Sequence, residues 1–366
     1  MSLNCLKKIE FFDWNSLSCM DRAILYAALT MNEESAIPFI LLRYHFSEYL
    51  RKWSKLGRCD HLYYKKICQI LGLDLELILC EDGELETQIG CEINESTKFV
   101  CAVDNYYQKD SNYYNAIHHP HFICLYGYAS GSFDAYDEDY SGQFWIKENF
   151  LHGIRYVSKS ISIDELKILA NTQHLFDRKN ACILYKISKK RSVNNQMSKL
   201  CKEYYRQLEY MVNNANQELD FLLHKISLFR SFQEEYNKEY RALVFGKTPM
   251  LEDQKKSNLK KLIKYPGGWC YAESRIKHIG AQKKFFELCS YNSPPINAFL
   301  EQFNDILHLS EALELQVAKL VITGSEHDFD IALEMFNNIY RREIDAYIEA
   351  IKQYKYFEEA INVFSK

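Results

Sequence analysis

The sequence is poor in the residues that mark turns, with 13 glycines and 6 prolines among 366 residues. Because these two residues are the strongest breaks in regular structure, their scarcity favours a chain rich in helix. No CxxC pair occurs among the 12 cysteines, which argues against a zinc ribbon or a thioredoxin-type redox motif. Scattered cysteines inside apolar runs behave as small buried hydrophobic residues, so we expect a reduced, cytoplasmic protein.

Two further features are missing. There is no run of eighteen apolar residues and no charged-then-apolar start, so neither a membrane span nor a secretory signal is expected. There is also no excess of positive charge: the formal net charge is −4, which argues against a nucleic-acid partner. The remaining composition, 47% hydrophobic and 26% charged, is that of a soluble globular protein long enough for two domains.

The first half of the chain mixes helical and strand patterns, which predicts an α+β domain over residues 1–187. Apolar residues three and four apart predict helices at Cys19–Asn32, Phe39–Trp53 and Leu62–Leu71. Short apolar runs predict strands at Leu75–Cys80, Phe99–Ala102, Phe122–Tyr126, Phe133–Tyr136 and Cys182–Ile187.

The second half reads as helix throughout. A polar stretch over 188–200 is interpreted as a linker, and 201–366 as an all-helical domain. Within it, a seam with alternating spacings of four and three residues runs over three heptads from Leu208 to Phe229. The seam indicates the core of a helical bundle, and the alternative is a groove for a partner helix or a homodimer contact.

Cys19 is the candidate nucleophile. Ser18 and Asp21 form an S-x-x-D capping box, which predicts a helix that starts at Ser18. Cys19 then falls in the first turn, where unpaired N–H groups and the positive end of the helix dipole favour the thiolate. The same N–H groups can stabilise an oxyanion.

The candidate base lies in a predicted hairpin. His121 opens an apolar strand, and Asp137 closes the next one. A loop centred on Ala129 places Asp137 directly opposite His121, where a carboxylate can orient an imidazole. Two alternatives stay open: the pair is structural, or a register slip replaces Asp137 by Asp139. Metal binding by His118, His119 and His121 is a weaker interpretation, because three ligands so close in an extended segment do not readily converge on one ion.

Two short motifs resemble known proteins. The stretch from His121 through Ile-Cys-Leu to Gly-Tyr, with Asp137 sixteen positions after the histidine, resembles the catalytic hairpin of papain-like domains, including bacteriocin leader peptidases. The strand before it, Phe99-Val-Cys-Ala-Val-Asp-Asn-Tyr-Tyr, resembles the N-terminal domain of the butirosin-biosynthesis acyltransferase family, whose members also carry a helical C-terminal region. The resemblance covers about residues 10–175.

The resemblance implies a papain-like fold, with an antiparallel sheet packed on helices, and acyl transfer in natural-product biosynthesis. Cys19 would take an acyl group from a thioester, such as one on an acyl carrier protein, with His121 as base and Asp137 as its orienting group. The acceptor would be a small-molecule or peptide amine, and neither a cofactor nor a metal is required. A papain-like peptidase or amidase, and a binding protein that has lost catalysis, are the alternatives.

The sequence departs from these families near the nucleophile. Ser18 stands where family members often have a histidine, and the family's downstream glycine-rich loop is absent. Asp13 occupies the position of the oxyanion-stabilising glutamine of papain-like enzymes, which leaves Asn15 as the nearby amide for that role. Tyr106, Tyr107 and Tyr126 are candidates for lining a substrate pocket, although buried tyrosines more often belong to an ordinary core.

Overall fold

The computed structural model describes residues 19–31, 41–42, 61–109, 111, 114–115, 118, 120–139, 155–172, 182–190, 196–230, 269–289 and 291–362. These residues fall into two compact units, one reaching to Cys201 and the other starting at Lys202. We call them the sheet unit and the helical unit.

The sheet unit is built on one six-stranded, fully antiparallel sheet with the order β1-β6-β2-β3-β4-β5. Its strands are β1 (Leu73–Cys80), β2 (Thr97–Asp104), β3 (Pro120–Ala129), β4 (Ser132–Asp139), β5 (Arg155–Ser162) and β6 (Cys182–Lys189). Its helices are α2 (Cys19–Thr30), α4 (His61–Ile70), α5 (Leu85–Gly90) and α6 (Ile163–Leu169), with a 3-10 turn η3 (Asp82–Glu84) before α5.

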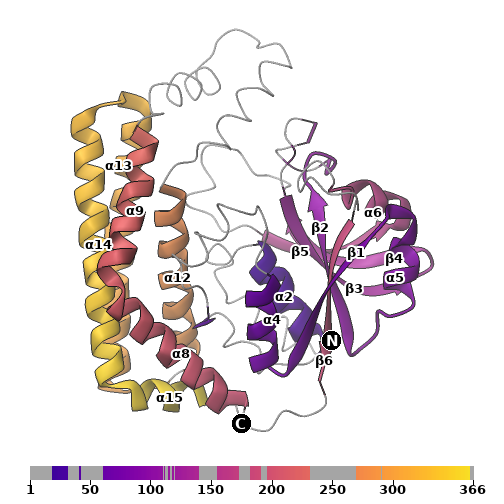
Figure 1. The fold of residues 1–366 in the computed structure, drawn as a ribbon, viewed down its shortest axis with the longest axis horizontal. Coiled ribbons are helices and arrows are strands. Elements are labelled where there is room, and N and C mark those ends of the chain that lie inside the picture. The colour runs from indigo at the N-terminus through magenta and orange to yellow at the C-terminus, as the bar shows by residue number, and fades with distance from the viewer. Residues whose placement is uncertain are drawn as a thin grey trace. The chain divides into compact units, whose positions relative to one another are not determined.

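Both faces of the sheet are covered by helices. Helices α2 and α4 lie on one face, and α5 and α6 lie on the other (Figure 1). The α5/α6 face buries alternate residues of the central strands, among them Cys101, Ile123, Leu125 and Ala135, against Leu166 of α6 and its neighbours. The alternation follows from strand geometry, in which successive side chains point to opposite faces.

The α+β class and the predicted strands are confirmed, although each strand except β6 starts earlier than expected and most also end later. Strand β5 was not predicted, because its sequence, Arg-Tyr-Val-Ser-Lys-Ser-Ile-Ser, has serines and a lysine where apolar residues would mark a strand. Helix α6 begins directly after it, where the Ser162 hydroxyl accepts a hydrogen bond from the Glu165 N–H as an N-cap. Of the expected helix over Phe39–Trp53, Leu41 and Leu42 form part of a 3-10 turn and the rest lies outside the described residues.

The helical unit contains α9 (Ala215–Arg230), α12 (Trp269–Leu288), α13 (Pro294–Thr323), α14 (Glu326–Lys352) and α15 (Tyr354–Asn362), together with most of α8 (Gln196–Asn213). The expected linker over 188–200 therefore begins inside β6 and ends inside α8. Residues 196–200 are helical because Met197 and Leu200 bury one face of α8. The predicted heptad seam is divided between α8 and α9, which meet at Asn214, and of its members Leu208, Leu222 and Ile226 are buried.

A buried polar chain crosses the helical unit. Tyr204 Oη donates to Gln282 Oε1 at 2.8 Å, Gln282 Nε2 donates to Tyr347 Oη at 2.8 Å, and Tyr347 Oη donates to Glu343 Oε1 at 2.7 Å. All four side chains are buried, and they come from α8, α12 and α14. Because buried polar groups need partners, this chain favours one register of the three helices over others.

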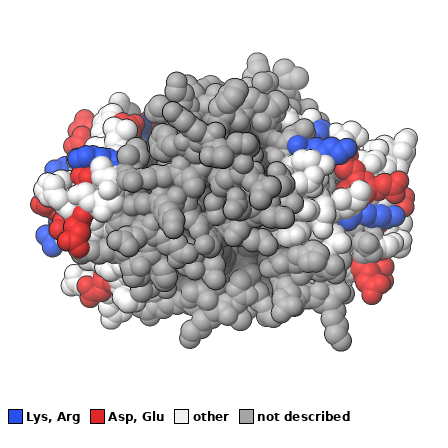
Figure 2. Space-filling model, turned by 90° about the horizontal axis from the view of Figure 1, so that it is seen from above, with Lys and Arg blue, Asp and Glu red and all other residues white. Residues whose placement is uncertain are grey.

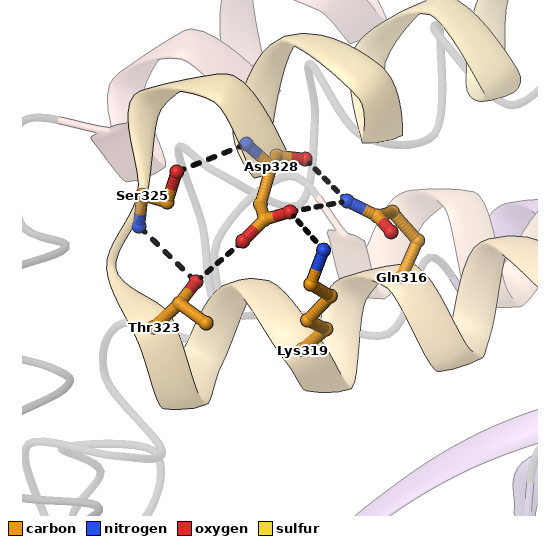
Figure 3. Close-up of polar contacts among 5 residues, drawn as sticks. All are labelled: Gln316, Lys319, Thr323, Ser325 and Asp328. Atoms are coloured by element: carbon orange, nitrogen blue, oxygen red, sulfur yellow. Dashed lines mark hydrogen bonds and ion pairs between the residues drawn. The ribbon is translucent and has the colours of Figure 1, made fainter.

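The turn between α13 and α14 is tied by Asp328, shown with its partners in Figure 3. Its carboxylate accepts from Thr323 Oγ1 at 2.7 Å and from Lys319 Nζ at 2.7 Å, and its own N–H donates to the Ser325 hydroxyl. Gln316 Nε2 adds a hydrogen bond to the backbone oxygen of Asp328 at 3.0 Å. Hydrogen bonds from Lys319 and Thr323 lower the pKa of Asp328 to about 2, so the carboxylate is charged at the start of α14, where the helix dipole favours it.

Candidate functional site

The candidate site lies at the end of the sheet where β2 finishes and β3 begins. Asp104, the last residue of β2, pairs with Pro120, and Val103 pairs with His121. The chain between the two strands carries Gln108 and His118. Histidines and carboxylates from three different segments therefore gather at one end of the central strands.

His121 and Asp137 form a buried hydrogen-bonded pair. His121 Nε2 lies 2.6 Å from Asp137 Oδ1, and the two residues are 3% and 2% exposed. The other carboxylate oxygen, Oδ2, accepts from Gln108 Nε2 at 2.9 Å and from Lys159 Nζ at 2.5 Å. Burial by itself raises the pKa of Asp137, but the electrostatic attraction and hydrogen bond of His121, together with the Lys159 ammonium group, outweigh it and lower that pKa to about 2.

The predicted register of the hairpin is wrong, although the pair it was meant to explain is present. The turn lies at Ser130 and Gly131, both with positive φ, rather than at Ala129, and Leu125 pairs with Ala135. A bulge between Leu125 and Gly127 shifts the pairing again. When the register is continued, Asp137 is a diagonal neighbour of His121 on the same face, a separation that long side chains can span.

A second histidine–aspartate pair was not predicted. His118 Nδ1 lies 2.6 Å from Asp104 Oδ2, and the other oxygen of Asp104 accepts from the Tyr106 N–H at 3.0 Å. The His118 ring stacks on Tyr106 with 4.2 Å between centroids, and Tyr107 meets the Tyr106 ring edge-on at 5.1 Å. Asp104 is fully buried and the His118 side chain is 30% exposed. The pair therefore joins the two ends of the β2–β3 connection.

Cys19 is the first residue of α2 and is partly exposed. Its helix packs on the sheet through Tyr26, whose ring stacks on Tyr136 with 3.5 Å between centroids and meets Tyr126 edge-on at 5.6 Å. Tyr136 and Asp137 are adjacent in β4, so their side chains point to opposite faces. The structure brings His121 and Asp137 together, but it places the helix of Cys19 on the other face of the sheet.

The remaining predicted site residues divide in the same way. Tyr106 and Tyr107 lie beside His118, at the candidate site. Tyr126 packs against Tyr26 of α2, whereas Tyr107 packs against the Leu125 cluster on the other face of the sheet. Asn15 lies outside the described residues, as do Asp13 and Ser18.

Over the parts of the chain that the structure describes, no cluster of three or more histidine, cysteine or acidic side chains could hold a metal ion. His118 pairs with Asp104 and His121 pairs with Asp137, so these two histidines face different carboxylates. His119 lies outside the described residues. Within the described ranges, no helix is both long and apolar enough to cross a bilayer.

On the face shown in Figure 2, the charges of the described residues are mixed rather than segregated. Figure 2 shows lysine and arginine side chains interspersed with aspartate and glutamate wherever described residues reach that face. This distribution, together with the net charge of −4, gives no extended basic surface in that view.

The sequence pattern does not predict two of the partners of Asp137, Gln108 and Lys159. Gln108 lies in the connection between β2 and β3, and nothing in its neighbourhood marks it as a carboxylate ligand. Lys159 belongs to β5, the strand that the apolar pattern does not reveal. For the pair of Asp104 and His118, the available signal was position alone: one ends a strand and the other lies just before the next.

No protein-family model matches the chain, and no curated protein matches it.

Proposed function

We propose that the protein transfers an acyl group through a thioester on Cys19, with His121 as the base and Asp137 as the group that orients and stabilises it. The observation that carries the proposal is the buried hydrogen bond of 2.6 Å between His121 and Asp137. A base held by a buried carboxylate is the arrangement that activates a thiol or hydroxyl nucleophile.

In the proposed mechanism the two ring nitrogens of His121 take different roles. Nε2 faces Asp137, so Nδ1 is the nitrogen that would take the Cys19 proton as sulfur attacks the acyl carbonyl. A new C–S bond forms, and the donor leaves as a thiol after receiving that proton. His121 then takes a proton from the incoming amine, the C–N bond forms and Cys19 is released. Exchange of a thioester for an amide is downhill, so the cycle needs no ATP.

The substrates follow from the same chemistry and from the resemblance to the butirosin-biosynthesis acyltransferases. The donor is a thioester, such as an acyl carrier protein, and the acceptor is an amine. Tyr106 and Tyr107 are the candidates for substrate contact, since they lie with His118 at the end of the sheet that holds His121. If water replaces the amine, the same residues would give a peptidase or amidase.

One observation favours a second candidate, a binding protein on this fold without catalysis. Helix α2 packs on the face of the sheet opposite to the buried pair, so the Cys19 thiol has to reach His121 around the end of the sheet. In a catalytically inactive protein, the His121–Asp137 pair is a structural tie between β3 and β4.

Intact-protein mass spectrometry after incubation with an acyl-thioester, such as an acyl-pantetheine, tests the proposal. The native chain should gain one acyl group, and Cys19→Ala should gain none. Cys91→Ala is the matched control, because Cys91 is an exposed thiol away from the site and its loss should leave the adduct unchanged. His121→Asn should slow the gain by about 100-fold or more, the usual contribution of a general base.

Each outcome favours one reading. An adduct that Cys19→Ala abolishes, and that passes to an added amine in preference to water, supports the acyltransferase. Release as free acid whether or not an amine is present supports the hydrolase. An equal gain in the native chain and in Cys19→Ala, or no gain in either, refutes the proposal and leaves the binding protein.

A further inference from the structure

Lys159 is an unexpected member of the buried pair's surroundings. It lies in β5 opposite Ala135 of β4, and it shares the face of the sheet on which Asp137 points. Because Ala135 is small, the lysine can extend over it, and its Nζ reaches Asp137 Oδ2 at 2.5 Å. The lysine side chain is 29% exposed, whereas that of Asp137 is 1% exposed.

Two basic groups therefore share one carboxylate. Oδ1 faces His121, and Oδ2 receives Lys159 and the neutral amide of Gln108. The ammonium group of Lys159 already balances the single negative charge of Asp137. A proton on His121 would then leave a net positive charge in a buried setting, which desolvation disfavours.

We propose that Lys159 is a positioning residue that holds the His121 imidazole in its neutral, proton-accepting form by sharing the Asp137 carboxylate. Asp104, at the end of β2, is paired with His118, and strand alternation points its side chain to the face opposite to that of Val103 and His121. Among the described residues of β5, Lys159 is the one whose positive charge contacts the buried His121–Asp137 pair.

The effect of Lys159 on the reaction rests on the proposed function. A neutral imidazole can accept a proton from an incoming amine, whereas an imidazolium cannot. Lys159 therefore extends amine transfer to lower pH, at the cost of a weaker thiolate–imidazolium ion pair at Cys19. It would act through Asp137 and would not touch the substrate.

Titration of the His121 ring by NMR, with ¹³C-labelled histidine and His121→Asn to assign the signal, tests the inference without any acyl chemistry. Lys159→Met and Lys159→Gln should both move the midpoint upward by about one pH unit, since a nearby like charge disfavours the protonated ring. Lys159→Arg, which keeps the charge, should stay within about 0.3 of a unit of the native value.

Lys186→Met is the matched control. Lys186 is a partly buried lysine on β6 of the same sheet that forms an ion pair with Glu92, and its loss should not move the His121 signal. A midpoint that is unchanged or moves downward in both Lys159→Met and Lys159→Gln overturns the inference. Using two neutral variants keeps the test decisive if one of them does not fold.

A second readout links the inference to the reaction. If the native protein forms the Cys19 adduct, the rate of amine transfer can be measured against pH. The low-pH limb of this profile should move upward in Lys159→Met by the same amount as the NMR midpoint. In Lys159→Arg it should return to the native position. Failure of the adduct to form would refute the proposed function while leaving the NMR result as a property of the fold. A shifted NMR midpoint with an unshifted transfer limb would overturn the link between Lys159 and catalysis.

Discussion

Replacing Asp137 by asparagine should destabilise the sheet unit by about 2–3 kcal/mol at pH 7. The native carboxylate accepts hydrogen bonds from His121, Lys159 and Gln108 in a buried site. Asparagine has the same shape, but it carries no charge and sets an NH₂ donor against another donor. Breaking a buried ion pair typically costs about 3–5 kcal/mol, and the loss here is smaller because Lys159, 29% exposed, can turn to water.

Linkage gives a similar magnitude and fixes its dependence on pH. The pKa of Asp137 is lowered to about 2 in the folded protein, against roughly 3.9 for an unfolded aspartate, which corresponds to about 2.5 kcal/mol. A carboxylate whose pKa is depressed contributes its stability above the unfolded value and loses it as the pH falls through the folded value. About half of the contribution should therefore be gone near pH 3, and the difference between native protein and Asp137→Asn should shrink accordingly.

Hydrogen exchange of the β3 and β4 amides measures this locally, which matters because a chain with two compact units need not unfold in one step. Asp134→Asn is the matched control: Asp134 lies on the same strand and is exposed, so its variant should stay within about 0.5 kcal/mol of the native protein. Equal protection of these amides in native protein and Asp137→Asn at pH 7, or a difference that does not shrink by pH 3, would refute the reasoning.

Two further predictions concern the helical unit. Gln282→Leu should lower its unfolding free energy by about 1–3 kcal/mol, because the buried Tyr204 hydroxyl loses its acceptor, and adding Tyr204→Phe should restore part of the loss in urea titrations. An additive double variant would contradict this account. Asp328→Asn should lower the thermal midpoint at pH 7, and the difference should fade as the pH drops from about 4 towards 2, since the depressed pKa of Asp328 makes its contribution a property of the carboxylate. A difference that is the same at pH 7 and pH 2.5 would show that the Lys319 and Thr323 contacts are not what stabilises this turn.

Much of the sheet unit can be read from local pattern, and the exceptions have physical causes. Strands β2 and β3 are nearly continuous apolar runs because both of their faces are buried, so their existence is evident without their neighbours. Strand β5 has a lysine where the pattern calls for an apolar residue. That lysine is Lys159, and its partner Asp137 lies 22 positions earlier in the chain, on the adjacent strand β4.

The hairpin shows where local pattern becomes insufficient. The sequence predicts that Asp137 shares the face of Ala135 and Phe133, and that parity is correct. The predicted register is wrong because the positive φ of Ser130 and Gly131 fixes a two-residue turn between Ala129 and Ser132. A bulge between Leu125 and Gly127 then shifts the pairing again. The predicted partner of Leu125 is Phe133 and the observed partner is Ala135, a shift of two residues. Because side chains alternate with a period of two, this shift keeps each side chain on its predicted face. The sequence therefore predicts the His121–Asp137 pair, although the two residues are not directly opposite.

Periodicities of a few residues are enough to predict the α+β class, the helix that begins at Cys19 and the parity that puts His121 and Asp137 on one face. Only the folded chain shows which face of the sheet α2 covers, which oxygen of Asp137 contacts His121, and that Lys159 and Gln108 bind the other oxygen. Those facts depend on contacts between segments far apart in the chain, and local propensity carries no record of them.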